Sequence, residues 1–506
     1  MTGLGRLAPP PTARPATVSA EREAPSPEAG HEGDGPAGSE RRSGRFRAAA
    51  APLRVRGFRL LVIGQTVSTV GDYLYEVGLP FLLLDHGGSA AELGLFLGTY
   101  GVARAVATVA AGSLADRFGH RRMMLVADTL RMVVVALLGS LALAGRPALG
   151  ILLSLAVPLG VGAGLFLPAS FAVIPDLVPA ALLQEANALE SSTAMGASLV
   201  GPVLGGIVVA VFGSAAALLG DAFTFAISAA SLVAIGAVVP RPARARTAHL
   251  DEPVPSDKPG GDLPAAPPSG TATLDRGAHR PEPREPEPEP VGSPAGEWED
   301  AGSPGRGAPD PVPQTFWGFV RSSPLAQGVL TAAFVANLCF GGVLDVALPV
   351  LARGPLHGGA AGYGAILAGF GAGGLVGSLL STLVARGQHR VRLALTLFTL
   401  QGVVIALVPF APGVAGVTAL FAVTGVANAL ANVLFLTVLQ RRVPAAMLGR
   451  FMSAIVFANF GLYPLSAALA GLAIHQVGAA PLFPLAGAVL VAGVGLGWAR
   501  REVRDA

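Results

Sequence analysis

The chain has 506 residues, of which 52% are hydrophobic and only 13% are charged, and its formal net charge is +3. A soluble globular domain carries about 25% charged residues, so this composition excludes an ordinary soluble fold and indicates a polytopic membrane protein. A single cysteine, Cys339, excludes an internal disulfide.

The chain begins with a polar segment, residues 1–57, that is rich in Pro, Ala, Gly, Glu and Arg and has no apolar core. Such a segment buries too little apolar surface to offset the entropy of ordering, so we expect a disordered tail without a signal peptide. Seven arginines between residues 41 and 59 precede the first apolar segment. A basic cluster beside a membrane helix favours the cytoplasmic side.

Two sets of six apolar segments follow, each long enough to cross a hydrocarbon core of about 30 Å as a helix. The first set comprises 58–84, 93–115, 123–143, 149–172, 187–212 and 215–239, and the second comprises 325–351, 362–385, 391–410, 413–437, 450–475 and 480–499. Residues 240–318 separate the sets and contain a Pro-Glu repeat without hydrophobic periodicity, which predicts a disordered cytoplasmic linker. The sequence therefore predicts an all-α integral membrane fold of twelve transmembrane helices in two six-helix halves, 58–239 and 319–506.

Arginine in the connections predicts the orientation of these helices. Twelve arginines lie on one side of the predicted fold: Arg117, Arg121, Arg122, Arg386, Arg390, Arg392, Arg441, Arg442, Arg450, Arg500, Arg501 and Arg504. Only Arg146 and Arg353 lie in the short loops on the other side. The arginine-rich side and both termini are therefore expected in the cytoplasm.

The two halves resemble each other in sequence. Residues 76–80, Glu-Val-Gly-Leu-Pro, match residues 345–349, Asp-Val-Ala-Leu-Pro, and two further matches follow at equivalent places in the halves. Three ordered matches indicate a parallel internal repeat, so the halves are expected to be pseudo-symmetric about an axis along the membrane normal.

A short charged connection, residues 112–122, is the most specific motif. It reads Gly-Ser-Leu-Ala-Asp-Arg-Phe-Gly-His-Arg-Arg and resembles the loop between the second and third helices of the major facilitator superfamily of secondary transporters. We expect Gly112 to allow close helix approach, Gly119 to allow a tight turn and Asp116 to lie beside a helix start. The resemblance implies a gating loop, in which Asp116, Arg117 and Arg121 brace the two halves and Arg121 and Arg122 anchor at the anionic surface. A positive-inside loop without a gating role is the alternative.

A glycine-rich string in the fifth segment resembles the antiporter motif of the same superfamily, which is typical of exporters driven by proton entry. Its marked residues are Gly196, Gly201, Pro202, Gly205 and Gly206. Gly369, Gly373 and Gly377 in the eighth segment form a stripe that is expected to face this motif, or to serve ordinary close packing. The fourth segment lacks the arginine that many proton-coupled exporters of the superfamily carry there. Either Arg104 or Arg131 takes its place, or the coupling differs from that of those exporters.

Several ionisable residues lie inside the predicted membrane segments, where each costs at least about 2.5–3.5 kcal/mol. We expect Asp72 to pair with Arg104, and Asp128 to pair with Arg131 at i and i+3. Some of Asp72, Glu76 and Asp345 are expected to exchange protons or bind a cationic substrate, unless they form fixed ion pairs. Possible substrate contacts are Gln65, Asn337, Asn428 and Asn432, which are also suited to hydrogen bonds between helices.

Further phrases refine the resemblance. Residues 58–65, the pair Gly71-Asp72, the pair Leu79-Pro80 and residues 174–179 are similar to the enterobactin-exporter and transmembrane secretion effector group. The sequence contains no metal cluster, phosphate loop or catalytic triad, so neither a cofactor, a metal, a nucleic-acid partner nor an enzymatic activity is expected.

The resemblance implies an exporter in the bacterial plasma membrane, and a monomer is the default expectation because the sequence does not indicate an oligomeric state. It would move a drug, siderophore or other secondary metabolite by proton antiport with alternating access. A proton-coupled uptake symporter and a membrane sensor or assembly partner that does not transport are the alternatives.

Overall fold

The computed structural model describes residues 50–145, 147–238, 316–384, 390–443, 450–451, 454–455, 457 and 461–499. These residues are predominantly helical and include no β-strand, which confirms the all-α prediction for the part of the chain described. Most of the predicted tail, 1–57, and of the predicted linker, 240–318, lies outside the described residues, so their disorder stays a prediction.

Long helices cover the first set of predicted segments. The elements are η1 (Ala51–Arg54), α2 (Arg56–Asp85), α3 (Ala90–Phe118), α4 (His120–Ala144), α5 (Leu149–Leu177), η2 (Ala180–Leu182) and α6 (Leu183–Val238). The second set is covered by α7 (Phe316–Ser322), α8 (Pro324–Gly342), η3 (Val343–Ala347), α9 (Leu348–Arg353), α10 (Gly359–Val384), α11 (Arg390–Ala406), η4 (Val408–Phe410), α12 (Gly413–Arg442), α14 (Tyr463–Val477) and α15 (Leu482–Ala499).

Seven helices of the described chain are long and apolar enough to cross a membrane, so the protein is a multi-pass membrane protein by length and composition. One of these spans, Ala180–Ala237, is interrupted at Gly213, which has φ 83° and ψ 167°. The break lies between the predicted segments 187–212 and 215–239. The predicted count of twelve is not reproduced as twelve separate spans and stays a prediction.

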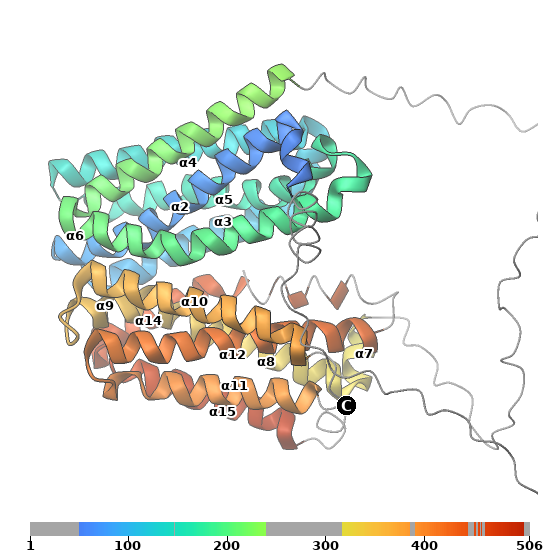
Figure 1. The fold of residues 1–506 in the computed structure, drawn as a ribbon. Coiled ribbons are helices and arrows are strands. Elements are labelled where there is room, and N and C mark those ends of the chain that lie inside the picture. The colour runs from blue at the N-terminus through green and yellow to red at the C-terminus, as the bar shows by residue number, and fades with distance from the viewer. Residues whose placement is uncertain are drawn as a thin grey trace, which may run out of the picture.

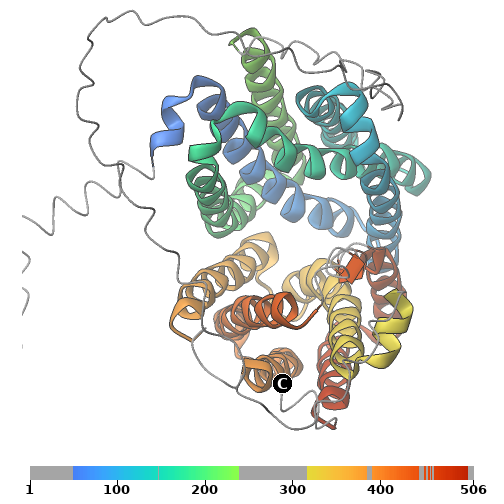
Figure 2. The ribbon, with the colours of Figure 1, turned by 90° about the vertical axis from the view of Figure 1, so that its right-hand side faces the viewer.

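The helices gather in two groups. In Figure 1, α2 to α6 form the blue and green group, and α8 to α15 form the yellow and red group. The view turned by 90° separates the same two groups (Figure 2). The two groups correspond to the predicted halves, and we call them the first and second half.

Small residues allow the close packing within the first half. Gly64, Gly71 and Gly78 recur every seven residues along α2 and face the second part of α6. An added Cβ at Gly71 would lie 2.8 Å from the Cβ of Thr224, and one at Gly78 would lie 3.2 Å from the Cβ of Ala217. Because association of helices in lipid depends on van der Waals contact, this glycine face lets the two helix backbones approach closely.

Two helix pairs make most of the contact between the two halves. In the first pair α3 meets α14, where an added Cβ at Gly94 would lie 2.9 Å from the Cα of Gly471. In the second pair α6 meets α10, where a Cβ at Gly206 would lie 2.9 Å from the carbonyl oxygen of Ala360.

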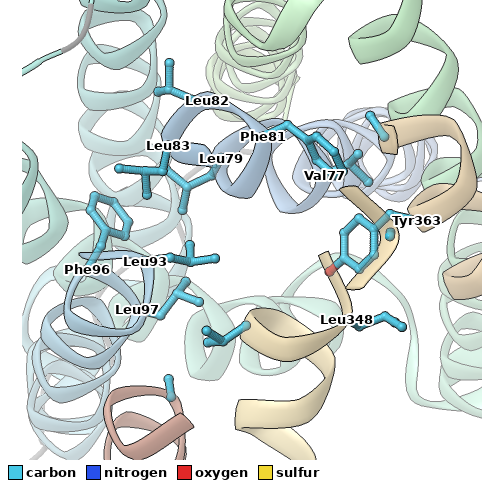
Figure 3. Packing of buried hydrophobic residues seen from close by; sticks show 14 of the residues in the cluster. Val77, Leu79, Phe81, Leu82, Leu83, Leu93, Phe96, Leu97, Leu348 and Tyr363 are labelled. Atoms are coloured by element: carbon cyan, nitrogen blue, oxygen red, sulfur yellow. The ribbon is translucent and has the colours of Figure 1, made fainter. Parts of the chain in front are cut away.

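These contacts lie toward the end of the bundle that is predicted to face outward. At this end Arg353 Nε donates to Asp85 Oδ1 over 2.7 Å, which links the two halves by an exposed ion pair. Figure 3 shows the buried hydrophobic packing nearby, with Phe81 of α2 beside Tyr363 of α10 and ring centroids 6.1 Å apart. The halves are therefore closed together at this end.

Candidate functional site

A cavity of about 880 Å³ lies between the two halves. The first half contributes residues from α2, α3, α4, α5 and α6, and the second contributes Asp345 of η3, Tyr363 of α10 and Tyr463 of α14. Its polar and charged lining consists of Gln65, Thr69, Asp72, Tyr75, Glu76, Tyr100, Arg104, Arg131, Ser170, Glu190, Ser191, Ser198, Asp345, Tyr363 and Tyr463. Four of the predicted charged site residues, Asp72, Glu76, Arg104 and Asp345, thus line one cavity, together with Gln65.

Glu76 and Asp345 occupy equivalent places in the two halves. Each lies four residues before a proline, Pro80 in α2 and Pro349 in α9. Proline has no N–H, so neither Glu76 nor Asp345 receives the usual helical hydrogen bond on its carbonyl oxygen. In the second half the helix widens here into the π-turn η3, which ends with the Leu348 N–H donating to the Val343 carbonyl. The sequence repeat therefore places an acid and a weakened helix turn at the cavity from each side.

Arg131 of α4 lies at the centre of the charge network in the first half. It forms ion pairs with Asp128 and with Asp72, and its Nη1 lies 3.5 Å from Asp72 Oδ1. Its guanidinium carbon lies 4.2 Å from the ring centroid of Phe166 and 4.3 Å from that of Phe225. Two aromatic faces and two carboxylates reduce the cost of holding this charge in the bundle.

The network extends from Arg131 through two neutral side chains. Ser228 Oγ donates to Asp128 Oδ2 over 2.7 Å, and Gln65 Nε2 donates to Ser228 Oγ over 3.5 Å. Asp128 is fully buried, whereas the Asp72 side chain is 50% exposed because it faces the cavity. The predicted Asp128–Arg131 pair is therefore confirmed, and it is connected to the cavity through Asp72.

Arg104 was predicted to pair with Asp72. The ion pair recorded for Asp72 is with Arg131, while Arg104 acts electrostatically on both Asp72 and Asp345. Asp345 also forms a hydrogen bond with the Tyr463 side chain. The positive charge of Arg104 thus acts on acids of both halves. The prediction considered only a pair within the first half, so it did not include Asp345.

The fourth predicted segment, which lacks the arginine of many proton-coupled exporters, is α5, and it packs against Arg131 of α4. An added Cβ at Gly162 of α5 would lie 2.8 Å from Cγ of Arg131. The glycine leaves room for the stem of Arg131, which reaches across from α4. Both candidate substitutes border the fourth helix, Arg131 through its side chain at Gly162 and Arg104 through its backbone at Gly164.

The predicted gating loop is a single non-helical residue between α3 and α4. Gly119 has φ 89° and ψ 138°, a conformation that favours glycine, so its predicted role in a tight turn is confirmed. Arg121 Nη1 donates to the Leu232 carbonyl over 2.8 Å, and His120 pairs with Asp176 over 2.9 Å. These contacts hold the loop to α6 and α5 of its own half.

Two expectations for this loop are wrong in the structure. An added Cβ at Gly112 would meet no atom within 4 Å, so none of the helices that the structure describes approaches it closely. Asp116 lies exposed in the last turn of α3, which is a helix end and not a helix start. Gly112 has open space because the described helices of the two halves meet at the opposite end of the bundle, whereas Asp116 lies in a helix end because α3 continues to Phe118, beyond the expected end at residue 115. Arg117 and Arg122 are likewise exposed.

The antiporter-type motif in α6 contacts two different helices. Gly201 and Gly205 face Tyr73 of α2, and an added Cβ at Gly205 would lie 2.8 Å from the Tyr73 carbonyl oxygen. Gly206 and the carbonyl of Pro202 face α10, where a Cβ at Gly364 would lie 3.0 Å from the Cα of Gly206. A Cβ at Gly196 would meet nothing within 4 Å.

Of the two roles expected for the glycine stripe on α10, ordinary close packing is confirmed, and a contact of these glycines with the motif in α6 is wrong. Gly369, Gly373 and Gly377 pack against α12 of their own half, at Thr418, Ala422 and Val426. The glycines of α10 that meet α6 are Gly364, opposite Gly206, and Gly371, opposite the Ser198 carbonyl at 2.7 Å from an added Cβ. The two glycine sets lie on different faces of one helix, and spacing alone does not tell which face meets which neighbour.

The three asparagines do not line the cavity. Asn337 Nδ2 donates to the Ala333 carbonyl of its own helix over 2.8 Å. Asn432 is exposed, and its Nδ2 donates to both oxygens of Asn428 over 2.9 Å. Of the predicted polar contacts, only Gln65 is brought to the cavity.

Comparison with known proteins now complements this geometry. The family model described as the Major Facilitator Superfamily matches residues 61–467. The chain belongs to this superfamily. Membership assigns it to the membrane transporters and not to the enzymes, and superfamily transporters act on small molecules.

Curated relatives match part of the chain. The multidrug efflux pump Tap of Mycolicibacterium fortuitum is 31% identical over 166 residues, which are 31% of this chain and 40% of the pump. Tap of Mycobacterium tuberculosis (strain ATCC 25618 / H37Rv) is 29% identical over 183 residues, 35% of this chain and 43% of the pump. The matched stretch thus spans about two fifths of the length of these relatives.

Solved structures share the superfamily fold over a larger part of the chain. A bacterial homologue of the iron transporter ferroportin, in an inward-facing state, has a TM-score of 0.57 and 13% identity over 87% of this chain and 98% of that chain. The nucleoside transporter NupG has a TM-score of 0.58 and 9% identity, again over 87% of this chain and 97% of its own. Such identities support a common fold only.

The sequence analysis did not predict that tyrosines line the cavity. The chain has only five, and four of them, Tyr75, Tyr100, Tyr363 and Tyr463, line the cavity. The scarcity of tyrosine in so apolar a chain was the available signal, since a hydroxyl in a membrane helix needs a polar partner. Sequence reasoning also missed Glu190 of α6, which lines the cavity and lies near the start of the predicted segment 187–212.

Proposed function

We propose that this protein exports a small organic molecule, such as a drug, siderophore or other secondary metabolite, and that proton entry drives the export. The observation that carries the proposal is the cavity between the halves, in which acids from both halves and Arg104 face one space of about 880 Å³. That volume is in the range of pockets that hold drug-sized ligands. The similarity to multidrug efflux pumps supports the direction of transport.

The direction is also supported by the antiporter-type motif at the contact between the halves. Gly206 and Gly364 let α6 and α10 touch through their backbones, without side chains that interlock. A smooth contact of this kind permits one half to rock against the other, as alternating access requires. The predicted arginine distribution supports a bacterial plasma membrane location with both termini and the open end of the cavity in the cytoplasm. We treat the protein as a monomer.

The proposed coupling step uses Glu76 and Asp345. Both acids face the cavity from weakened helix turns, and charge on both disfavours their close approach. Protonation of one carboxylate removes this repulsion. A cationic substrate bound between the two carboxylates offsets the same repulsion with its positive charge. Proton and substrate then compete for one pair of carboxylates, which is sufficient for exchange transport.

The gating loop has a separate proposed role. Asp116, Arg117, Arg121 and Arg122 lie at the end of the bundle where the described helices of the two halves are apart. We propose that they brace the halves in the alternative state, in which this end closes. In the state described here, the hydrogen bond of Arg121 to Leu232 keeps the loop folded against its own half.

The experiment is flux in proteoliposomes with a defined protein orientation and an imposed pH gradient. Wild-type protein is expected to move a dye or drug cation against the direction of proton flow, and Glu76→Gln is expected to lose the dependence on the gradient. Arg59→Gln, which changes an exposed side chain at the start of α2, outside the cavity and the gating loop, is the control. Co-directional movement of substrate and protons would establish uptake symport, and a wild-type flux equal to that of protein-free liposomes would refute transport.

A further inference from the structure

A second cavity of about 350 Å³ opens beside the first, between α6 and α10. Pro202 of α6 and Tyr73 of α2 form its wall in the first half. Phe370 and Gly374 of α10 belong to its wall in the second half. The space therefore lies on the contact between the halves, next to the point where Ser198 and Gly371 touch.

This second cavity is mainly apolar, and its few ionisable residues lie at one place. Leu344, Leu367, Phe370 and Leu375 contribute hydrocarbon and aromatic surface. Glu76 and Asp345 line both cavities, so the two spaces meet at this pair of carboxylates. The lining of the larger space carries a greater share of polar groups than the lining of the smaller one.

The carboxylate pair leaves one acid available to a ligand. Asp345 has a hydrogen bond with Tyr463 and interacts electrostatically with Arg104. Glu76 makes neither an ion pair nor a side-chain hydrogen bond with the residues that the structure describes. An acid without a partner beside an apolar space suits a ligand that carries a positive charge next to an apolar group.

We propose that the second cavity is a substrate subsite, the α6–α10 subsite, which holds an aromatic or aliphatic group of an organic cation whose charge lies between Glu76 and Asp345. This inference rests on the proposed function, because it assigns the class of substrate that the exporter takes. It also adds a distinct binding place on the contact between the halves, outside the main cavity.

The location gives the subsite a mechanical consequence. Its walls belong to different halves, so its shape changes when α6 and α10 move against each other. An apolar group held there contacts both halves at once. Release of the substrate then accompanies movement of the halves, because the subsite exists only in one of their arrangements.

Gly374 provides a direct test. An added Cβ at this position would meet no atom within 4 Å, so a larger side chain enters the subsite without displacing the backbone. Gly374→Leu is expected to fill the subsite, and Gly374→Ala to fill it in part. Gly150→Leu is the matched control, since Gly150 also has open space around its Cβ but lies at the exposed start of α5.

The ligands are two permanent cations that differ in apolar bulk, tetraphenylphosphonium and tetraethylammonium. Binding of each radiolabelled ligand to the purified full-length protein is measured by equilibrium dialysis. Gly374→Leu is expected to weaken tetraphenylphosphonium at least about tenfold, as for loss of a hydrophobic pocket contact, and to change tetraethylammonium less than about twofold. Glu76→Gln is expected to weaken both.

Three results overturn the subsite: no binding of tetraphenylphosphonium to wild type, an equal effect of Gly374→Leu on both cations, or no effect on either. Proton-driven flux of tetraethylammonium into proteoliposomes tests the proposed function independently. If flux depends on the gradient and Gly374→Leu changes the binding of neither cation, the subsite is refuted and the proposed export function stands. Subsite-dependent binding without such flux supports the subsite and refutes the exporter.

Discussion

The pair of Asp128 and Arg131 yields the sharpest prediction on stability. Arg131→Met removes the guanidinium between Phe166 and Phe225 and leaves the carboxylate of Asp128 fully buried with only the hydroxyl of Ser228 as a partner. Breaking a buried ion pair from one side costs about 3–5 kcal/mol. For a unit the size of one half, this corresponds to a fall in Tm on the order of 10 °C.

The expected recovery distinguishes this reasoning from a general packing effect. The double variant Asp128→Asn with Arg131→Met removes the buried charge while keeping an acceptor for Ser228, so most of the lost stability is expected to return. Arg122→Met on the same helix changes an exposed side chain and is expected to stay within about 0.5 kcal/mol of wild type. Thermal unfolding of the purified protein in detergent, followed by the loss of helical signal in far-UV circular dichroism, measures all three.

Two outcomes would contradict the argument. A single Arg131→Met variant as stable as wild type would mean that the charge network contributes little. A double variant no more stable than the single one would mean that loss of the stacked side chain, and not the buried charge of Asp128, causes the destabilisation.

Three further variants test other features of the fold. Gly119→Ala is expected to cost about 1–3 kcal/mol because φ is 89°, whereas Gly112→Ala, in open helical surroundings, leaves Tm unchanged. Gly364→Val is expected to force α10 away from α6. The measurement is the yield of a disulfide engineered between positions 85 and 353 in a Cys339→Ser background, which is expected to fall. Gly150→Val is the control. Arg353→Gln is expected to lower stability by less than about 1 kcal/mol, since both partners of its ion pair are about half exposed; a fall in Tm above 5 °C would disprove this.

The sequence was sufficient to predict features that depend on local chemistry or on the repeat. The helical segments, the glycine turn at Gly119 and the equivalence of Glu76 with Asp345 follow from hydropathy, loop length and internal similarity. The pairing of Asp128 with Arg131 follows from helical spacing. Each of these depends on neighbours along the chain or on a matching segment in the other half.

Features that depend on the rotation of one helix against another were not predictable. The central place of Arg131 requires that α4 turn toward α2 and α5, which the nearly uniform apolar composition does not determine. The same holds for α10, where two sets of glycines face α12 and α6. The side of a membrane helix that faces lipid and the side that faces another helix are both apolar. Composition therefore gives little information on which side meets which neighbour.

The wide turn at Asp345 gives the two halves unequal freedom. A π-turn contains one residue more than an α-turn, and successive residues of an α-helix are about 100° apart around the axis. When such a turn shifts by one residue along the chain, the side chain that it passes swings by roughly this angle while the helix ends stay in place. Asp345 lies inside such a turn, whereas Glu76 lies in the uninterrupted helix α2. Both turns lack the hydrogen bond that a proline removes, but only Asp345 lies in a wide turn that can shift and change the direction of its carboxylate.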